Sequence, residues 1–150
     1  GYSRSEVHAI QLPAKSGTNP STEATHVWKY TKGAPTMSSP LLVGNELYFV
    51  SDSGGIFTCL DASTGREHYR ERLGGNHSSS PIFADGRIYL ASREGVTSVI
   101  QPGVAFQLIS HNKLAGKIMA SPAAVDTALF VRTDTAMYRI EQIPKVPQSN

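Results

Sequence analysis

The chain has 150 residues, of which 17% are charged, and a formal net charge of +2, which fits one domain without a strong charge bias. The basic residues form no run, so nucleic acid is not expected as a partner. The single cysteine, Cys59, excludes an internal disulfide framework and a multi-cysteine metal site, and no apolar run is long enough to cross a bilayer. Because the chain begins at Gly1 rather than Met, inside a repeat, we expect a mature or trimmed chain.

The sequence repeats itself with a period of about 41 residues. Ser39-Pro40 returns as Ser80-Pro81 and again as Ser121-Pro122, and the apolar triplet at 47–49 returns at 88–90 and 129–131. No insertion is needed to keep the copies aligned over residues 33–141. A period of this length is typical of four-stranded propeller blades. The predicted fold is therefore all-β, a partial β-propeller of about 3–4 four-stranded antiparallel blades in one domain, residues 1–150.

In chain order, the first unit is partial and covers about residues 1–32, with strands expected at 7–12 and 26–30 and a polar surface loop at 13–25 between them. The second unit, 33–73, has strands expected at 40–43, 46–51, 56–61 and 66–72. The third, 74–114, has them at 81–84, 87–92, 96–100 and 104–110. The fourth unit, 115–142, is again partial, with strands at 122–125, 128–132 and 136–141, and residues 143–150 form a tail.

The number of blades is too small for a closed ring, which typically has four to eight. We therefore expect a C-terminal piece of a larger propeller, completed by the missing blades of the parent protein. The last three strands leave a free sheet edge, which exposes unpaired backbone groups. Self-association of the isolated piece, or addition of a peptide strand along 136–141, would cover that edge.

Residues 60–67, LDASTGRE, resemble the repeat signature of the PQQ-like, or quinoprotein-dehydrogenase-like, propeller family. That signature has Asp, Ala and Gly in a turn and then an aromatic residue, whose place Tyr69 takes here; Trp28 lies one full repeat earlier. The resemblance covers about residues 26–141 and is weaker in the third unit, where Gln101-Pro102-Gly103 replaces the turn. The period alone also fits a WD40-type interaction propeller, although the Gly-His and Trp-Asp pairs of WD40 repeats are absent from the expected places.

The repeat motif has an expected structural role. Asp61 and, more weakly, Thr64 can accept hydrogen bonds from backbone N–H groups of the turn, and Gly65 can supply a left-handed residue. The aromatic side chains of Tyr69 and Trp28 are expected to dock between adjacent blades.

The resemblance implies two functional classes. Quinone-dependent alcohol or sugar dehydrogenases hold pyrroloquinoline quinone and Ca²⁺ on the channel axis, with an acidic base, ligating carboxylates and often a vicinal cysteine pair. Other members, such as outer-membrane assembly lipoproteins of the BamB type, keep the repeats without the cofactor and act as binding platforms. The chain has one cysteine, and its acidic residues sit mainly in turns, so we expect a platform for a protein, a peptide or a small ligand, with no cofactor and no catalytic residue. The resemblance also implies a periplasmic, secreted or cell-envelope location.

In this family the Ser-Pro segment begins the innermost strand, and its residues line one mouth of the central channel. The expected ligand-binding residues at this mouth are Ser38, Ser39, His77, Ser79, Lys117 and Ser121. The alternative is that their hydroxyl groups satisfy backbone groups where the strand begins. The five histidines, His8, His26, His68, His77 and His111, have no short ligand spacing, so no metal site is expected. Cys59, in the middle of a strand, is expected to be a buried hydrophobic residue rather than a reactive thiol.

Overall fold

The computed structural model describes residues 5–13 and 24–141, and these residues form thirteen strands and no helix. The strands make four antiparallel sheets, with the strands of each sheet side by side in chain order. Sheet 1 contains β1 (Val7–Gln11) and β2 (Thr25–Tyr30). Sheet 2 contains β3 (Leu41–Val43), β4 (Glu46–Val50), β5 (Ile56–Asp61) and β6 (Glu67–Arg72). Sheet 3 contains β7 (Ile82–Ala84), β8 (Arg87–Ala91), β9 (Val96–Gln101) and β10 (Gln107–Lys113), and sheet 4 contains β11 (Ala123–Val125), β12 (Ala128–Arg132) and β13 (Met137–Glu141).

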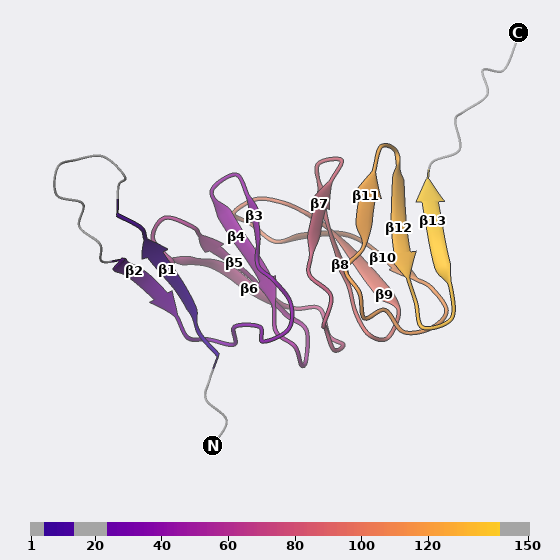
Figure 1. Cartoon of the computed structure of the whole chain (residues 1–150), viewed down its shortest axis with the longest axis horizontal. Helices are drawn as coiled ribbons and strands as arrows, with labels where there is room; N and C mark the ends of the chain where they lie inside the picture. Colours follow the sequence, from indigo (N-terminus) through magenta and orange to yellow (C-terminus); the bar gives the residue numbers. More distant parts are fainter. Residues whose placement is uncertain (1–4, 14–23, 142–150) are drawn as a thin grey trace, which may run out of the picture.

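The four sheets lie side by side along the longest axis of the molecule (Figure 1). Strand β7 contacts both β3 and β11, so the first strands of sheets 2, 3 and 4 form one row. This arrangement confirms the predicted all-β, partial-propeller fold. Two sets of turns mark its two ends in Figure 1: the upper turns β3–β4, β7–β8 and β11–β12, and the lower turns β4–β5, β8–β9 and β12–β13. Among the described residues no helix is long and apolar enough to cross a membrane.

The apolar core lies between the sheets. The largest cluster joins sheets 2 and 3 and contains Tyr48, Val50, Phe57, Cys59, Ile88, Leu90 and Ile100. A second cluster joins sheets 1 and 2 through Tyr30, Phe49 and Leu60, and a third lies at sheets 3 and 4 around Ala91, Ile118 and Val131. Strand β4 is buried on both faces because it contributes to the first two clusters, which explains its continuous apolar sequence.

The upper hairpins keep the register of the sequence repeat throughout. Leu41 pairs with Tyr48, Ile82 with Tyr89 and Ala123 with Phe130, so each pair lies one full repeat beyond the last. These hairpins close through short turns, and Asp85 and Asp126 adopt positive φ angles of 46° and 50° there.

The lower turns become shorter from sheet 2 to sheet 4. The alignment of the repeats without insertions is therefore wrong at these turns. The backbone bond that closes the turn runs from Ser51 to Ile56 in sheet 2 and from Ser92 to Val96 in sheet 3. In sheet 4 it runs from Thr133 to Ala136. Each turn is therefore one residue shorter than the one before it. In sheet 3 a longer β9–β10 loop compensates, so the sequence period is unchanged.

The prediction for strand β10 was wrong. A strand was expected at 104–110, but β10 occupies Gln107–Lys113, one full period after the strand expected at 66–72, and it begins where Gln107 pairs with Gln101 at the end of β9. The other strands begin and end within one residue or so of the predicted bounds. Most of the loop expected at 13–25, and the tail at 143–150, lie outside the described residues.

The last strand of sheets 1, 2 and 3 carries a β-bulge at the same repeat position. The extra residues are Val27, His68 and Ile109, each one full repeat after the last. A bulge adds local twist and changes which side chains face the neighbouring sheet. In sheets 1 and 2 the residue after the bulge is the aromatic of the repeat motif, Trp28 or Tyr69.

Candidate functional site

The Ser-Pro segments form a chain of hydrogen bonds between neighbouring sheets. The backbone N–H of Ser39 donates to the Ser80 hydroxyl, and the N–H of Ser80 donates to the Ser121 hydroxyl, both at 2.8 Å. Each serine lies just before the first strand of its sheet. Two of the expected ligand-binding residues, Ser39 and Ser121, therefore take part in the framework that ties sheets 2, 3 and 4 together.

Two further serines are buried. The hydroxyl of Ser79 donates to the backbone carbonyl of Ala91 at 2.7 Å, and that of Ser38 donates to the carbonyl of Val50 at 3.5 Å, the same contact one repeat earlier. Both serines are buried where the second strand of the sheet ends. These contacts match the alternative stated above, in which the hydroxyl groups satisfy the backbone at the start of each sheet.

His77 lies inside the junction between sheets 2 and 3. Only 1% of its surface is exposed, and its ring nitrogens Nδ1 and Nε2 each lie 3.0 Å from a carbonyl oxygen, of Ala91 and Gly74 respectively. The backbone of Gly55 passes so close that a Cβ there would lie 1.9 Å from the Gly74 oxygen and 2.9 Å from His77 Nε2. His77 is thus enclosed by protein.

Each lower turn uses a carboxylate to hold the segment that precedes the first strand of its own sheet. Asp52 accepts the N–H of Met37 at 3.2 Å, Glu94 accepts the N–H of Asn76 at 3.1 Å, and Asp134 accepts the N–H of Lys117 at 2.8 Å. The bonds from Asn76 lower the pKa of Glu94 to about 2, because they stabilise the ionised carboxylate. These carboxylates therefore stabilise the lower turns, where the sequence placed most of the acidic residues.

A shallow hollow lies at the lower turns of sheets 3 and 4. The hollow, of about 610 Å³, is lined by Arg93, Glu94, Gly116, Lys117 and Met119. Arg93 extends toward sheet 2, where its Nη2 lies 3.2 Å from the sulfur of Met37, and its Nε is buried without a partner among the described residues. Of the six residues expected to bind a ligand, Lys117 alone lines this hollow.

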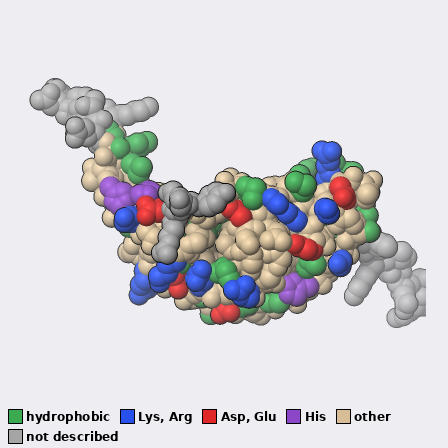
Figure 2. Space-filling model, turned by 90° about the horizontal axis from the view of Figure 1, so that it is seen from below, with side chains coloured by type: hydrophobic (Ala, Val, Ile, Leu, Met, Phe, Trp, Pro, Cys, Tyr) green, Lys and Arg blue, Asp and Glu red, His purple; other side chains and the backbone are tan. Residues whose placement is uncertain are grey.

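Met37 and Met119 occupy the same repeat position two units apart, and 52% and 59% of their surfaces are exposed. Ser78 takes this position in the unit between them. We call Met37, Arg93, Lys117 and Met119 the axial patch. Figure 2 views the molecule from below, the side of the lower turns, where basic, acidic and hydrophobic side chains lie interspersed among uncharged ones. The sequence analysis named Lys117 but missed the other three; the recurrence of Met at 37 and 119 was the available signal.

The repeat motif forms a hydrogen-bonded turn around Asp61. The carboxylate of Asp61 accepts the backbone N–H groups of Ser63 at 3.0 Å and Thr64 at 2.8 Å, as well as both hydroxyl groups. These bonds lower the pKa of Asp61 to about 2, the two hydroxyl groups having the largest effects. The Thr64 hydroxyl in turn accepts the N–H of Arg66 at 3.3 Å, and Gly65 has a φ of +71°.

The aromatic residues of the motif dock on the next sheet. Trp28 of sheet 1 donates its indole N–H to the carbonyl of Ala62 in the β5–β6 turn, at 3.1 Å. Tyr69 of sheet 2 packs edge-on against Phe106 in the β9–β10 loop, with ring centroids 5.7 Å apart. Each aromatic thus fixes the outer turn of the following sheet.

A quinone–calcium site of the dehydrogenase type does not fit the described residues. Ca²⁺ requires six to eight oxygen ligands, several of them from carboxylates. Over residues 5–13 and 24–141, no group of three His, Cys, Asp or Glu side chains is placed to hold a metal ion. The carboxylates nearest the axial patch are already hydrogen-bonded to the backbone. Cys59 is buried, and burial raises the pKa of its thiol to about 11.

Comparisons with known proteins place this geometry in a family. No curated protein matches the sequence significantly. Among solved structures, BamB from Moraxella catarrhalis superposes with a TM-score of 0.51 at 13% identity, over 93% of this chain and 54% of that one. A europium-containing methanol dehydrogenase superposes with a TM-score of 0.54 at 14% identity, over 74% of this chain and 22% of that one. This chain therefore spans about a fifth to a half of these structures, and at such identities the likeness shows the fold.

The family itself is shown by the sequence. The family model described as outer membrane protein assembly factor BamB matches residues 14–103, which is more than half of the chain. The chain therefore belongs to the BamB-like family of PQQ-type propeller-repeat proteins.

Proposed function

We propose that the chain is part of a propeller binding module without catalytic activity of its own, and that the axial patch docks a peptide segment of a protein partner. One observation carries the proposal: the serines, the histidine and the carboxylates at this end of the sheets are committed to internal hydrogen bonds. In the axial patch, by contrast, Arg93 and Lys117 have no ion-pair partner among the described residues, and Met37 and Met119 are more than half exposed. The axial patch can provide contact area and positive charge, which suits the binding of a partner rather than catalysis.

The composition of the patch suggests the partner's chemistry. Methionine side chains are flexible and polarisable, so they adapt to different apolar surfaces. Arg93 and Lys117 have no carboxylate within ion-pair distance among the described residues. Glu94 is the acidic lining residue, and Asn76 occupies its carboxylate. A peptide that combines apolar side chains with carboxylates would satisfy both parts of the patch, because a cation gains most from a charged acceptor.

The likeness to an outer-membrane assembly factor supports a protein partner rather than a small substrate. It also supports a location in the cell envelope for the protein that contains this chain, which we include in the proposal. Fractionation of cells that express the full reading frame would test the location directly.

The binding proposal is tested by fluorescence anisotropy with two labelled peptides that differ only in charge, one with Asp and Leu alternating and one with Lys and Leu. We expect the acidic peptide to bind at least about tenfold more tightly, which corresponds to about 1.4 kcal/mol. Replacing Arg93 and Lys117 together by Gln should remove that preference. Arg87→Gln, which removes an exposed charge at an upper turn, is the matched control and should leave binding unchanged.

Equal binding of the two peptides, or binding that is insensitive to the double substitution, would overturn the assignment of the patch. Stoichiometric uptake of pyrroloquinoline quinone in the presence of Ca²⁺, measured by absorbance, would instead favour the dehydrogenase class.

A further inference from the structure

The side chain of Arg93 starts from a fixed point in sheet 3 and reaches sheet 2. Its backbone N–H donates to the carbonyl of Asn76 at 2.7 Å, and its turn is closed by the bond from Ser92 to Val96. From this anchored position the guanidinium group extends to sheet 2, where Nη2 lies 3.2 Å from the sulfur of Met37. Sheets 2 and 3 each have four strands, so this contact lies inside the array of repeats rather than at one of its ends.

The guanidinium group of Arg93 has a buried donor that is not used. Three buried side-chain atoms lack a hydrogen-bond partner within the described part of the chain: Thr58 Oγ1, Tyr69 OH and Arg93 Nε. Of these three atoms, Nε is the one that belongs to a charged group. Buried polar groups are normally hydrogen-bonded, because an unmet donor loses its hydration without replacement. The Nε of Arg93 therefore has the capacity to bind a further acceptor.

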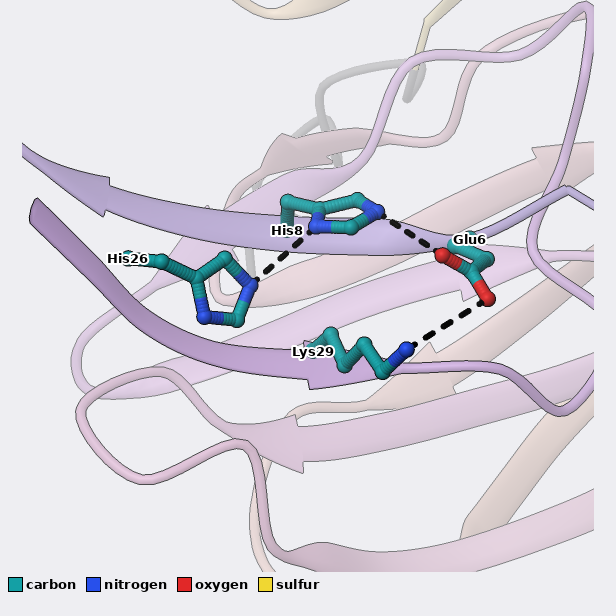
Figure 3. Close-up of polar contacts among 4 residues, drawn as sticks. All are labelled: Glu6, His8, His26 and Lys29. Atoms are coloured by element: carbon teal, nitrogen blue, oxygen red, sulfur yellow. Dashed lines mark hydrogen bonds and ion pairs between the residues drawn. The ribbon is translucent and has the colours of Figure 1, made fainter. Parts of the chain in front are cut away.

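The surroundings of Arg93 differ from those of basic side chains that have a carboxylate beside them. At sheet 1 the carboxylate of Glu6 lies 3.0 Å from His8 Nε2 and 4.0 Å from Lys29 Nζ (Figure 3). Arg93 has no carboxylate within ion-pair distance among the described residues. The sulfur of Met37 lies beside its guanidinium group instead, and a thioether sulfur is only a weak acceptor. An incoming carboxylate would therefore form stronger hydrogen bonds with Arg93 than Met37 does.

We propose that Arg93 binds one Asp or Glu carboxylate of the docked peptide through two parallel hydrogen bonds, from Nε and Nη2; this inference rests on the function proposed above. These two nitrogens share one edge of the planar guanidinium group, and their N–H bonds match the two oxygens of a carboxylate. In the unbound chain Met37 lies against Nη2, and 52% of its surface is exposed. Because a methionine side chain is flexible, Met37 can move aside when the carboxylate binds.

The two cations of the axial patch therefore have different roles. Lys117 lines the same hollow as Arg93, but an ammonium group is a point charge on a flexible stem and imposes no bidentate geometry. Lys117 adds attraction for any acidic segment, whereas Arg93 selects a carboxylate in one orientation. Exchanging Lys for Arg keeps the charge at either position, so such exchanges separate geometry from charge.

The test is fluorescence anisotropy of the full chain with a labelled peptide of alternating Asn and Leu, blocked at both ends, with or without one central Asp. For the unmodified chain the single Asp should tighten binding by at least about tenfold, as expected for a charge-assisted pair of hydrogen bonds. In Arg93→Lys the same Asp should tighten binding by less than about threefold, the range of an exposed ion pair. Lys117→Arg is the matched control and should keep the full gain.

Nuclear magnetic resonance of the arginine side chains reports the contact directly. The Nε–H proton of Arg93 should shift downfield when the peptide with the single Asp binds, because it gains a charged acceptor, and the methyl signal of Met37 should move with it. The peptide without Asp should leave both signals in place, and Arg87, which is exposed at an upper turn, should not respond to either peptide. Far-UV circular dichroism checks that the variants keep the fold.

The outcomes separate this inference from the function on which it rests. If the acidic and basic peptides of the previous test bind equally, the docking function itself fails. If the acidic peptide is preferred but the single Asp adds nothing, or its gain survives Arg93→Lys, the role of Arg93 alone is overturned. A gain that requires a free C-terminal carboxylate on the Asn and Leu peptide would overturn the assignment to a side-chain carboxylate.

Discussion

The contact between Trp28 and the β5–β6 turn permits a quantitative test of how neighbouring sheets are joined. A Cβ added at Gly65 would lie 2.6 Å from Trp28 Cδ2 and 2.7 Å from its Cε3, which is closer than atoms can approach. Gly65→Ala must therefore displace the indole ring or the turn. Displacing the ring also weakens the indole hydrogen bond to Ala62.

Two effects contribute to the cost of Gly65→Ala. Placing a non-glycine residue in the left-handed region at φ +71° costs about 1–2 kcal/mol. Overpacking against the indole ring adds about 1–3 kcal/mol. Gly74→Ala is the matched control, because Gly74 has a φ of +81° but a Cβ there would meet no atom within 4 Å. We expect the control to lose about 1–2 kcal/mol and Gly65→Ala to lose about 2–5 kcal/mol.

Urea unfolding followed by far-UV circular dichroism measures these losses. Fluorescence gives a second probe of the same junction, because Trp28 is the single tryptophan of the chain. In a Trp28→Ala background, where the obstacle is gone, Gly65→Ala should cost no more than Gly74→Ala does. The reasoning is refuted if Gly65→Ala and Gly74→Ala are equally destabilising, or if the extra cost persists without the indole ring.

Three further predictions concern other polar groups. Tyr48→Phe removes the hydroxyl that accepts the N–H of Gly103 at 2.8 Å, and should lower the free energy of unfolding in urea by about 1–2 kcal/mol; an unchanged value would exclude a role for this bond. The hydrogen bonds to Asp61 hold its pKa at about 2, below the usual value of about 3.9. The ionised carboxylate therefore stabilises the fold above about pH 4, and this contribution is lost as the pH falls toward 2. The urea midpoint of Asp61→Asn should therefore fall less between about pH 4 and pH 2 than that of the unmodified chain, and parallel curves would contradict this. Burial raises the pKa of the Cys59 thiol to about 11, so iodoacetamide should label Cys59 in urea but not in the native chain. Mass spectrometry measures the labelling, and rapid labelling of the native chain would contradict the burial of Cys59.

The repeated hairpins were predictable because their local chemistry repeats. Gly44, Gly86 and the Asp residues at 85 and 126 allow tight turns with positive φ, and these turns fix the register of the first two strands in each sheet. The bulges keep the same repeat interval, although no sequence signal announced them. The fold class and most strand bounds follow from such local rules.

The position of β10 was predictable from the period, because the strand expected at 66–72 moved on by 41 residues gives 107–113, and the expectation of 104–110 departed from the repeat. The period does conceal a change of loop length, because two changes cancel in the sequence. The lower turn of sheet 3 loses one residue, and the β9–β10 loop gains one, so the Ser-Pro period is unchanged. An alignment by period alone cannot detect a compensated shift. Tertiary contacts show it directly: Tyr48 of sheet 2 bonds to the backbone of Gly103 in the longer loop.

The candidate sites were harder to predict than the fold, because they depend on what the framework leaves free. Ser79 and His77 were expected to bind a ligand because they are polar, but both side chains are hydrogen-bonded to a backbone carbonyl group inside the molecule. Arg93 was missed because its position in a turn gave no sign that its side chain crosses to the neighbouring sheet.

The bonding of this fold separates its stability from its binding face. Neighbouring sheets are joined by backbone N–H groups that donate to the hydroxyls of Ser80 and Ser121. The carboxylates of the lower turns hold the backbone within their own sheets. The axial repeat position accordingly holds Met37 in one unit and Ser78 in the next while the surrounding bonds are kept. Such a scaffold can change what it binds without changing how it folds, since binding residues grafted on one fold can serve unrelated tasks. A europium-containing methanol dehydrogenase and BamB from Moraxella catarrhalis both share this fold with the chain.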